Sequence, residues 1–241
     1  ITAAAPASTE VMQYFAALGL TLNEGWGMSE CSCFGTLNPP HDIRVGTVGR
    51  PLPGVEVRIA DDGEMLVRAP LVMKGYRGDP EKTAEAIDRD GWLHTGDIAQ
   101  IDGDGYLRIV DRKKEIIINS AGKNMSPANI ELKLRAASPL IAQAVCIGDR
   151  RPYNVALLVL DREVLAKAFG GTAPSREVLH GAIAAAVEAA NAGLSRVEQI
   201  KRFAVLASDW QPGGDELTPT SKLKRKPVNE KYAAIIDDLY C

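Results

Sequence analysis

The stretch IVDRKKEIIINSAGKNMSP, residues 109–127, constrains the fold most, because the pattern of the chain changes there. Before it, glycines and prolines separate short β-rich segments, and after it strand-like and helix-like segments alternate. Within it, four charged residues at 112–115 directly precede three isoleucines and a Ser-Ala-Gly-Lys loop. We therefore predict two domains of different architecture, residues 1–112 and residues 113–241.

Apolar periodicity and turn residues predict the elements of each domain. The first domain is expected to hold a helix at 8–18, a short strand at 20–22, and strands at 55–59, 64–68, 98–101 and 106–110. The second is expected to hold strands at 115–119, 142–148, 156–161 and 202–206, and helices at 127–137 and 175–191. The first pattern is typical of a small β-barrel or β-layer, and the second of an α+β unit.

Composition excludes several classes of protein. A hydrophobic content of 46% and a charged content of 24% are typical of a folded chain. The net charge of -3 gives no general case for nucleic-acid binding, although Lys222, Lys224, Arg225 and Lys226 form a local basic run. Four cysteines show no spacing typical of a metal site, and no apolar run approaches the roughly 20 residues of a membrane span. We expect a cytoplasmic protein.

The segment NEGWGMSE, residues 23–30, combines glycines with an aromatic ring and a carboxylate. Gly25 and Gly27 would let the backbone approach a flat ligand, and Trp26 would stack on that ligand. Ser29 would donate to a phosphate, and Glu30 would hold Mg²⁺. The alternative interpretation is a turn that contains a core tryptophan.

Two further segments carry candidate chemistry. In HTGDIAQIDGDGYL, residues 94–107, Asp97 follows a glycine turn, where its carboxylate could accept from both hydroxyls of a ribose. Residues 102–105 are interpreted as a hairpin turn, because they lack the twelve-residue loop of a calcium site. LTPTSKLKRKP, residues 217–227, places Lys222 in a Pro/Thr/Ser turn, and the alternative is a solvated basic tail or a nucleic-acid patch.

In this order and spacing, the segments resemble the motifs of the adenylate-forming superfamily, which includes acyl-CoA synthetases, luciferases and peptide-synthetase adenylation domains. GWGMSE stands where the family has Tyr-Gly-x-Thr-Glu, and TGD at 95–97 is identical to its motif. GEMLVRAPLVMKGYRGDPEKT, DRKKEIIINSAGKNMSPANIE, LTPTSKLKRK and AAAP at 3–6 resemble further motifs. Trp26 for tyrosine and Ser221 for the usual glycine are departures that remove no required chemical group.

The resemblance implies an α/β fold combined with an α+β fold. Residues 1–112 would be the C-terminal part of the large AMP-binding domain, a sheet remnant plus a small β-barrel. Residues 113–241 would be the small, mobile C-terminal domain. Nothing here resembles the family's phosphate-binding loop, so the chain is expected to be the C-terminal part of a longer enzyme, and the isolated fragment is expected to be inactive.

The implied function is that of an ATP-dependent long-chain fatty acid:CoA ligase, which forms an acyl-adenylate with the help of Mg²⁺. Only 14 residues, Cys31 to Arg44, lie where ligases that load carrier proteins have an extra segment, which favours coenzyme A as the acceptor. Two alternatives stay open, a fatty-acyl-AMP ligase and a non-catalytic nucleotide-binding fragment. The expected partners are fatty acid, ATP and CoA, without nucleic acid, and peripheral membrane contact and oligomeric state are left open.

The resemblance also implies a role for individual residues. Lys222 and Glu30 would be catalytic, with Glu30 holding the metal, and Lys114 would lie at the hinge between the two domains. The nucleotide would be bound by Ala4, Ala5, Pro6, Gly25, Trp26, Gly27, Met28, Ser29, Asp97 and Arg112. Coenzyme A would pass along Ser120, Ala121, Gly122 and Lys123.

Overall fold

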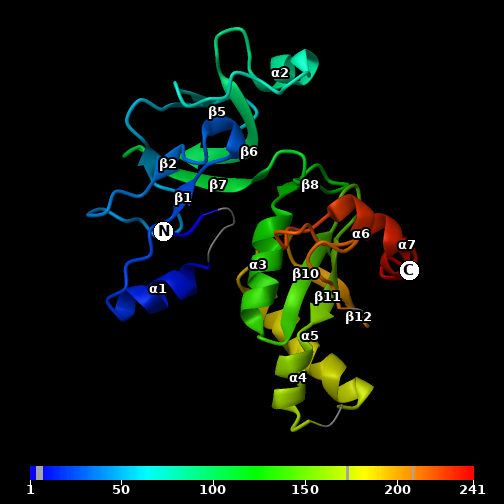
Figure 1. Cartoon of the computed structure of the whole chain (residues 1–241). Helices are drawn as coiled ribbons and strands as arrows, with labels where there is room; N and C mark the ends of the chain where they lie inside the picture. The colour runs from blue at the N-terminus through cyan, green and yellow to red at the C-terminus, as the bar shows by residue number, and fades with distance from the viewer. Residues whose placement is uncertain (4–7, 172–173, 208) are drawn as a thin grey trace. The chain divides into compact units, whose positions relative to one another are not determined.

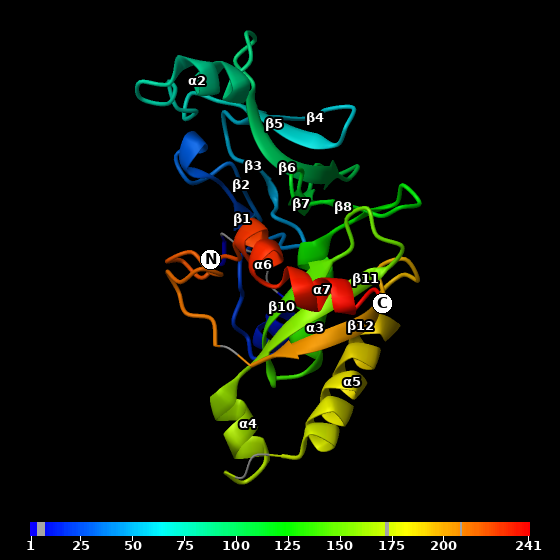
Figure 2. The same ribbon diagram turned by 90° about the vertical axis from the view of Figure 1, so that its right-hand side faces the viewer.

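The computed structural model describes residues 1–3, 8–171, 174–207 and 209–241. It contains two compact units, Ile1–Lys114 and Glu115–Cys241, shown in Figures 1 and 2. The units divide two residues beyond the boundary predicted after Arg112. Both mix helices with sheets, which confirms the predicted fold class. In the described part of the chain, no helix is long and apolar enough to cross a membrane.

Unit 1 is built on two antiparallel sheets. The larger has the order β4-β5-β6-β7, made of Glu56–Ile59, Glu64–Arg68, Leu93–Ile101 and Leu107–Arg112. The smaller has the order β1-β2-β3, made of Gly25–Trp26, Thr36–Leu37 and Arg50–Pro51. The Val48 amide donates to the Leu107 carbonyl and the Leu107 amide to the Gly49 carbonyl, both at 2.8 Å, and these bonds join the two sheets. The turn predicted at 102–105 does connect β6 to β7.

Helices of unit 1 begin at strong caps. Helix α1, Thr9–Ala17, starts after Ser8, whose hydroxyl accepts from the Val11 amide, and this confirms the predicted helix. Helix α2, Pro80–Ala86, was not predicted, although it has an Asp79 cap and a proline at its first position. The strand predicted at 20–22 is wrong. Leu20 is largely exposed there, because no neighbouring strand pairs with this short apolar run.

Unit 2 is centred on a three-stranded sheet in which β11, Asn154–Leu160, lies between β10, Ile141–Ile147, and β12, Ile200–Leu206. Strands β10 and β11 are antiparallel, and β11 and β12 are parallel. Every residue of β11 is buried, with alternate side chains in two core clusters. One cluster includes residues of helices α3 and α5, and the other includes residues of α6 and α7 (Figure 2).

The helices of unit 2 are α3, Pro127–Ala137; α4, Arg162–Ala168; α5, Arg176–Ala192; α6, Arg225–Lys231; and α7, Ala233–Asp238. The helix predicted at 127–137 is confirmed, since the Ser126 hydroxyl caps α3 and Pro127 occupies its first turn. The strand predicted at 115–119 is shorter: β8 covers Ile117–Ile118 and pairs with β9, Asn124–Met125. The chain turns back directly after Asn119, which leaves room for only two paired residues.

Candidate active site

Asp97 is the most tightly held candidate residue of unit 1. It lies on β6 and is almost fully buried. The Trp26 indole Nε1–H donates to its Oδ2 at 2.7 Å, and Arg112 Nε pairs with its Oδ1 at 2.7 Å. Burial raises the pKa of Asp97, while the Trp26 hydrogen bond and the Arg112 charge oppose that rise. Trp26 and Arg112, both predicted to bind the nucleotide, thus contact the carboxylate of a third such residue, Asp97.

Trp26 and Arg112 use part of the acceptor capacity of the Asp97 carboxylate. An ionised carboxylate offers about four acceptor sites, and Trp26 and Arg112 use one on each oxygen. The Thr95 hydroxyl accepts from the Asp97 amide at 3.1 Å and donates to the Met65 carbonyl at 2.6 Å, so the backbone at Asp97 is fixed as well. Thr95 was not predicted as a site residue, although it opens the TGD segment.

The glycines at 25 and 27 are needed for packing within unit 1, which was not predicted. A Cβ at Gly27 would lie 1.9 Å from the Cys33 carbonyl oxygen, and a Cβ at Gly25 would lie 2.9 Å from the Thr36 carbonyl oxygen. Both glycines are therefore required where the chain packs against itself. Their approach to a flat ligand stays a prediction.

Trp26 is a core residue, as the alternative interpretation held. It is 8% exposed and belongs to the core of unit 1. A Cβ at Gly35 would lie 2.5 Å from Trp26 Cζ3, so the chain itself packs on this ring. Its polar edge is directed at Asp97, a role that spacing along the sequence did not indicate.

Glu30 lies in a short 3-10 turn, Ser29–Cys31, that follows Met28. The Tyr76 hydroxyl donates to Glu30 Oε1 at 2.9 Å, and the Met73 amide donates to the Glu30 carbonyl at 2.7 Å. Ser29 is exposed, and Met28 packs partly on the core of unit 1. Tyr76 was missed as a neighbour of Glu30, since 46 residues separate them in sequence.

The surroundings of Glu30 fit a metal that arrives with its ligand. Within the described ranges, no group of three or more His, Cys, Asp or Glu residues could hold a metal ion. Mg²⁺ is commonly bound through one or two carboxylates together with substrate phosphates. A single carboxylate at Glu30 is therefore compatible with Mg²⁺ bound alongside ATP.

The residues around the unit boundary differ sharply in how they are held. Lys113 Nζ donates to Asp62 Oδ2 at 2.5 Å and to Glu64 Oε2 at 2.9 Å, so it is anchored to unit 1. These contacts were not predicted. Lys114, the predicted hinge residue, is exposed and is the last residue of unit 1. The anchored chain therefore ends at Lys113, one residue before the division.

The four residues predicted to line the CoA path form an exposed turn after β8. Asn119 Oδ1 accepts from the amides of Ala121 at 3.0 Å and Lys123 at 2.9 Å, and Gly122 adopts a left-handed φ of 72°. Ser120 is tied to the Arg151 carbonyl through its amide at 3.0 Å. The turn is thus organised around the side chain of Asn119.

Lys222 lies on a turn that is fixed at its backbone and free at its side chain. The Thr218 hydroxyl accepts from the Lys222 amide at 3.0 Å, and Ser221 takes a left-handed φ of 59°. The usual glycine at position 221 would fit this conformation without strain. Among the residues that the structure describes, the Lys222 ammonium has no hydrogen-bond or ion-pair partner. Ala4, Ala5 and Pro6, predicted to contact adenine, lie outside the described residues.

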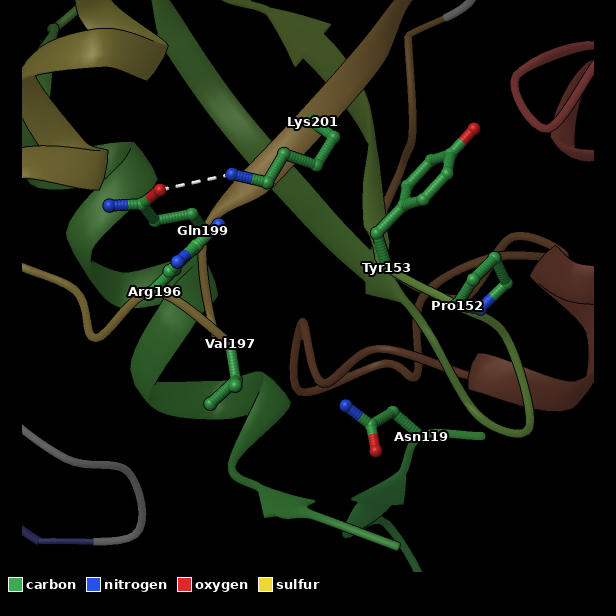
Figure 3. Close-up of a pocket in the computed structure, with 7 residues that line it drawn as sticks. All are labelled: Asn119, Pro152, Tyr153, Arg196, Val197, Gln199 and Lys201. Carbon is green, nitrogen blue, oxygen red and sulfur yellow. Dashed lines mark hydrogen bonds between the residues drawn. The ribbon is translucent and has the colours of Figure 1, made fainter. Parts of the chain in front are cut away.

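A cavity of about 270 Å³ in unit 2 was not predicted (Figure 3). Its lining mixes apolar and polar side chains, two of them basic, and consists of Asn119, Pro152, Tyr153, Arg196, Val197, Gln199 and Lys201. Asn119 is the residue that organises the turn at 120–123. Lys201 donates to Gln199 at 3.1 Å, as the dashed line in Figure 3 shows. The available sequence signal was Arg196 before β12 and Lys201 within it.

Comparison with known families connects these features. The profile of the AMP-binding enzyme C-terminal domain matches residues 114–241, and that of the AMP-binding enzyme family matches residues 1–77. The chain belongs to the AMP-binding enzyme family. The resemblance to the adenylate-forming superfamily is thereby confirmed.

Curated relatives of this AMP-binding enzyme are named as ligases. The chain is 55% identical to the putative fatty-acid–CoA ligase fadD11 of Mycobacterium tuberculosis and 42% identical to the long-chain-fatty-acid–CoA ligase FadD15 of Mycobacterium bovis. Each match covers 100% of the chain, but only 43% and 41% of the relatives. The chain therefore spans less than half the length of these proteins.

Solved structures give the same fold. The o-succinylbenzoate CoA synthetase MenE of Bacillus subtilis, in complex with the acyl-adenylate intermediate OSB-AMP, matches with a TM-score of 0.74 at 25% identity, over 94% of this chain and 44% of that one. The adenylation domain of a carboxylate reductase from Mycobacterium chelonae matches with a TM-score of 0.83 over 99% of this chain and 38% of that one. At 23% identity, the second match shows the fold alone.

Proposed function

We propose that this chain is the C-terminal part of an ATP-dependent long-chain fatty acid:CoA ligase that works through an acyl-adenylate. The observation that carries the proposal is the division of the candidate residues between two units. Asp97 and Arg112 belong to unit 1, and Lys222 belongs to unit 2, with the boundary between Lys114 and Glu115. A reaction in two steps can use one set of residues throughout and exchange the other.

In the first step, the fatty-acid carboxylate attacks the α-phosphorus of ATP and pyrophosphate leaves. Asp97 would accept from the ribose hydroxyls, with its orientation set by Trp26 and Arg112. The free ammonium of Lys222 would neutralise the negative charge that develops at phosphorus. Mg²⁺, held through Glu30, would supply charge neutralisation on the phosphates.

In the second step, the CoA thiol attacks the acyl carbonyl, the thioester forms and AMP leaves. We assign the turn at Ser120–Lys123 to this step, together with the cavity that shares Asn119 with it. Arg196 and Lys201 supply two cations at the cavity, and Asn119 is shared by the cavity and the turn. Cationic side chains and amides are suited to the phosphates of a nucleotide. A swing of unit 2 about Lys114 would exchange Lys222 for this surface.

Fatty acid as the substrate is supported by the names of the two mycobacterial relatives, and CoA as the acceptor by the same names. Cytoplasmic location stays a prediction. A non-catalytic nucleotide-binding fragment is the second candidate, and the short span of the chain relative to its relatives favours it for the isolated 241 residues.

Two assays of the complete gene product that contains these residues test the proposal. Pyrophosphate release from ATP and oleate reports the first step, and formation of oleoyl-CoA on addition of CoA reports the second. We expect both, with pyrophosphate release dependent on Mg²⁺. Chain 1–241 alone is expected to release none. A complete gene product that binds AMP but forms no adenylate would identify the non-catalytic alternative instead.

A further inference from the structure

Three distant parts of unit 2 meet at the guanidinium of Arg225. Its Nη1 and Nη2 donate to the two carboxylate oxygens of Glu131 at 2.6 and 2.9 Å, and its Nε donates to Glu115 Oε2 at 2.9 Å. Arg225 begins α6, Glu131 lies on α3, and Glu115 is the first residue of the unit. The contacts to Glu115 and Glu131 span 110 and 94 positions of sequence.

The contact of Arg225 with Glu131 is fixed in direction. A guanidinium that meets both oxygens of one carboxylate forms a planar fork with a defined orientation. Glu131 is itself held, because its Oε1 accepts from the Cys146 amide on β10 at 2.8 Å. The side chain of Arg225 is 19% exposed, and that of Glu131 is 9% exposed. Burial opposes the charged form of Arg225, but the two carboxylates raise its pKa overall, so the guanidinium stays charged.

Stability alone is a weak reason for such a cluster. A buried ion pair gains little over a well-packed apolar group of the same size, because desolvation offsets the attraction between the charges. What the pair does provide is a defined geometry between the segments that it joins. The cluster therefore fixes the positions of the joined segments relative to one another.

Arg225 joins the Lys222 turn, which the proposed first step uses, to the start of unit 2, next to the proposed hinge. Lys222 lies three residues before Arg225, and the intervening chain is held by an isolated bridge between Leu217 and Leu223. The Lys224 amide also donates to the Glu216 carbonyl at 2.8 Å. On the other side of the cluster, Glu115 directly follows Lys114, where the units divide. One side chain thus connects the start of unit 2 to the base of the Lys222 turn.

We propose that Arg225 is a positioning residue, which fixes the Lys222 turn to the start of unit 2 through Glu115 and Glu131. This inference rests on the proposed function. When the chain reorients at Lys114, Lys222 then moves with the start of unit 2 as one rigid body. The Lys222 turn keeps its conformation during this movement. The free ammonium of Lys222 needs this support, because in the described chain it has no partner of its own to place it.

The test uses Glu115→Gln and Arg225→Lys in the complete gene product. Glu115 is 41% exposed at its side chain, so its substitution leaves the core intact. We expect the rate of adenylate formation from oleate and ATP to fall by about 10-fold for Glu115→Gln and about 100-fold for Arg225→Lys, since small misplacements of a reacting group carry losses of that order. Thioester formation from supplied oleoyl-adenylate and CoA should be unchanged. The matched control is Lys226→Gln, one residue along α6, where the lysine is exposed and forms only a 3.9 Å pair with Glu230.

A double-mutant cycle separates positioning from a general effect on folding. If Glu115 acts through Lys222, then Glu115→Gln causes no further loss of adenylate formation in a Lys222→Ala background. Provided that the wild type forms the adenylate, two results would overturn the inference. One is an additive loss of adenylate formation in that background, and the other is an equal loss of rate in both steps.

Hydrogen exchange on chain 1–241 tests the coupling without any activity. We expect the amides of Lys222 and Lys224 to exchange faster in both variants, while those of α5 keep their protection. Unchanged exchange at these amides would contradict the coupling. A wild-type gene product that forms no adenylate would overturn the proposed function, and the exchange result would then decide the structural coupling by itself.

Discussion

The carboxylate of Asp97 and the ammonium of Lys222 are held in opposite ways. Asp97 is buried, and Trp26 and Arg112 contact its two oxygens. Lys222 is exposed on a turn, with its backbone fixed and its ammonium free within the described chain. A group that binds the same ligand atoms in both steps benefits from preorganisation. A group that must approach the reacting atoms in one step and leave them in the next cannot be held by fixed partners.

The largest expected effect is that of Lys222→Ala on adenylate formation. Loss of a preorganised charge at a transition state commonly lowers a rate by about 10²–10³-fold. Thioester formation from supplied oleoyl-adenylate should be spared, because the proposal assigns that step to the turn at 120–123. The two steps are assayed separately, with Lys226→Ala as the control. Equal loss in both steps would mean that Lys222 is not specific to one of them.

Asp97→Asn should weaken both steps, in contrast to Lys222→Ala. The amide keeps the shape of the side chain but loses the charge that faces Arg112 at 2.7 Å and one strong acceptor for the ribose. Charge-assisted hydrogen bonds contribute roughly 1.5–3 kcal/mol, so AMP affinity should fall about 10- to 100-fold. Calorimetric titration of the complete gene product measures this, and an unchanged affinity would remove Asp97 from the nucleotide site.

Trp26→Phe would remove the indole hydrogen bond to Asp97 and keep the charge of the carboxylate. The free energy of unfolding of unit 1 should fall by about 1 kcal/mol more than in Trp92→Phe, because only Trp26 donates to a buried carboxylate. Trp92 is equally buried at 8% exposure and makes cation–π contacts with Arg58 and Arg68. Urea unfolding followed by circular dichroism gives both values. Equal losses would show that the indole hydrogen bond contributes nothing measurable.

The smallest expected effect concerns how the free energy of unfolding of unit 1 falls at acid pH. Burial alone would raise the pKa of Glu64, but Lys113, the Gly96 amide and His94 together lower it below 4.5. A carboxyl group with a lowered folded-state pKa adds stability above its unfolded pKa and loses it as the pH falls through the folded value. Glu64→Gln should therefore reduce the loss of stability as the pH falls below the ordinary pKa of a glutamate side chain, about 4.3. Unfolding measured at several pH values tests this, and an unaltered acid limb would assign the loss to other groups.

Local signals in the sequence were sufficient for much of the fold. The helix at 127–137 and the strand at 64–68 have the predicted bounds. A serine cap and a proline in the first turn define the helix start over a few residues. The strand predicted at 20–22 failed because an apolar run becomes a strand only where a partner strand lies beside it, which three residues cannot indicate.

The sequence by itself determined the family, the order of the motifs and the charged candidate residues within them, because each motif is a short continuous segment. Only the tertiary structure decided that Trp26 donates a hydrogen bond to Asp97, 71 positions away, and that Arg225 donates one to Glu115, 110 positions away. It also decided that Gly25 and Gly27 accommodate the chain's own backbone. A hydrogen bond or a steric contact depends on atoms that meet in space. Residues that are distant in sequence meet only once strands and helices have packed, so spacing along the chain could not reveal these partners.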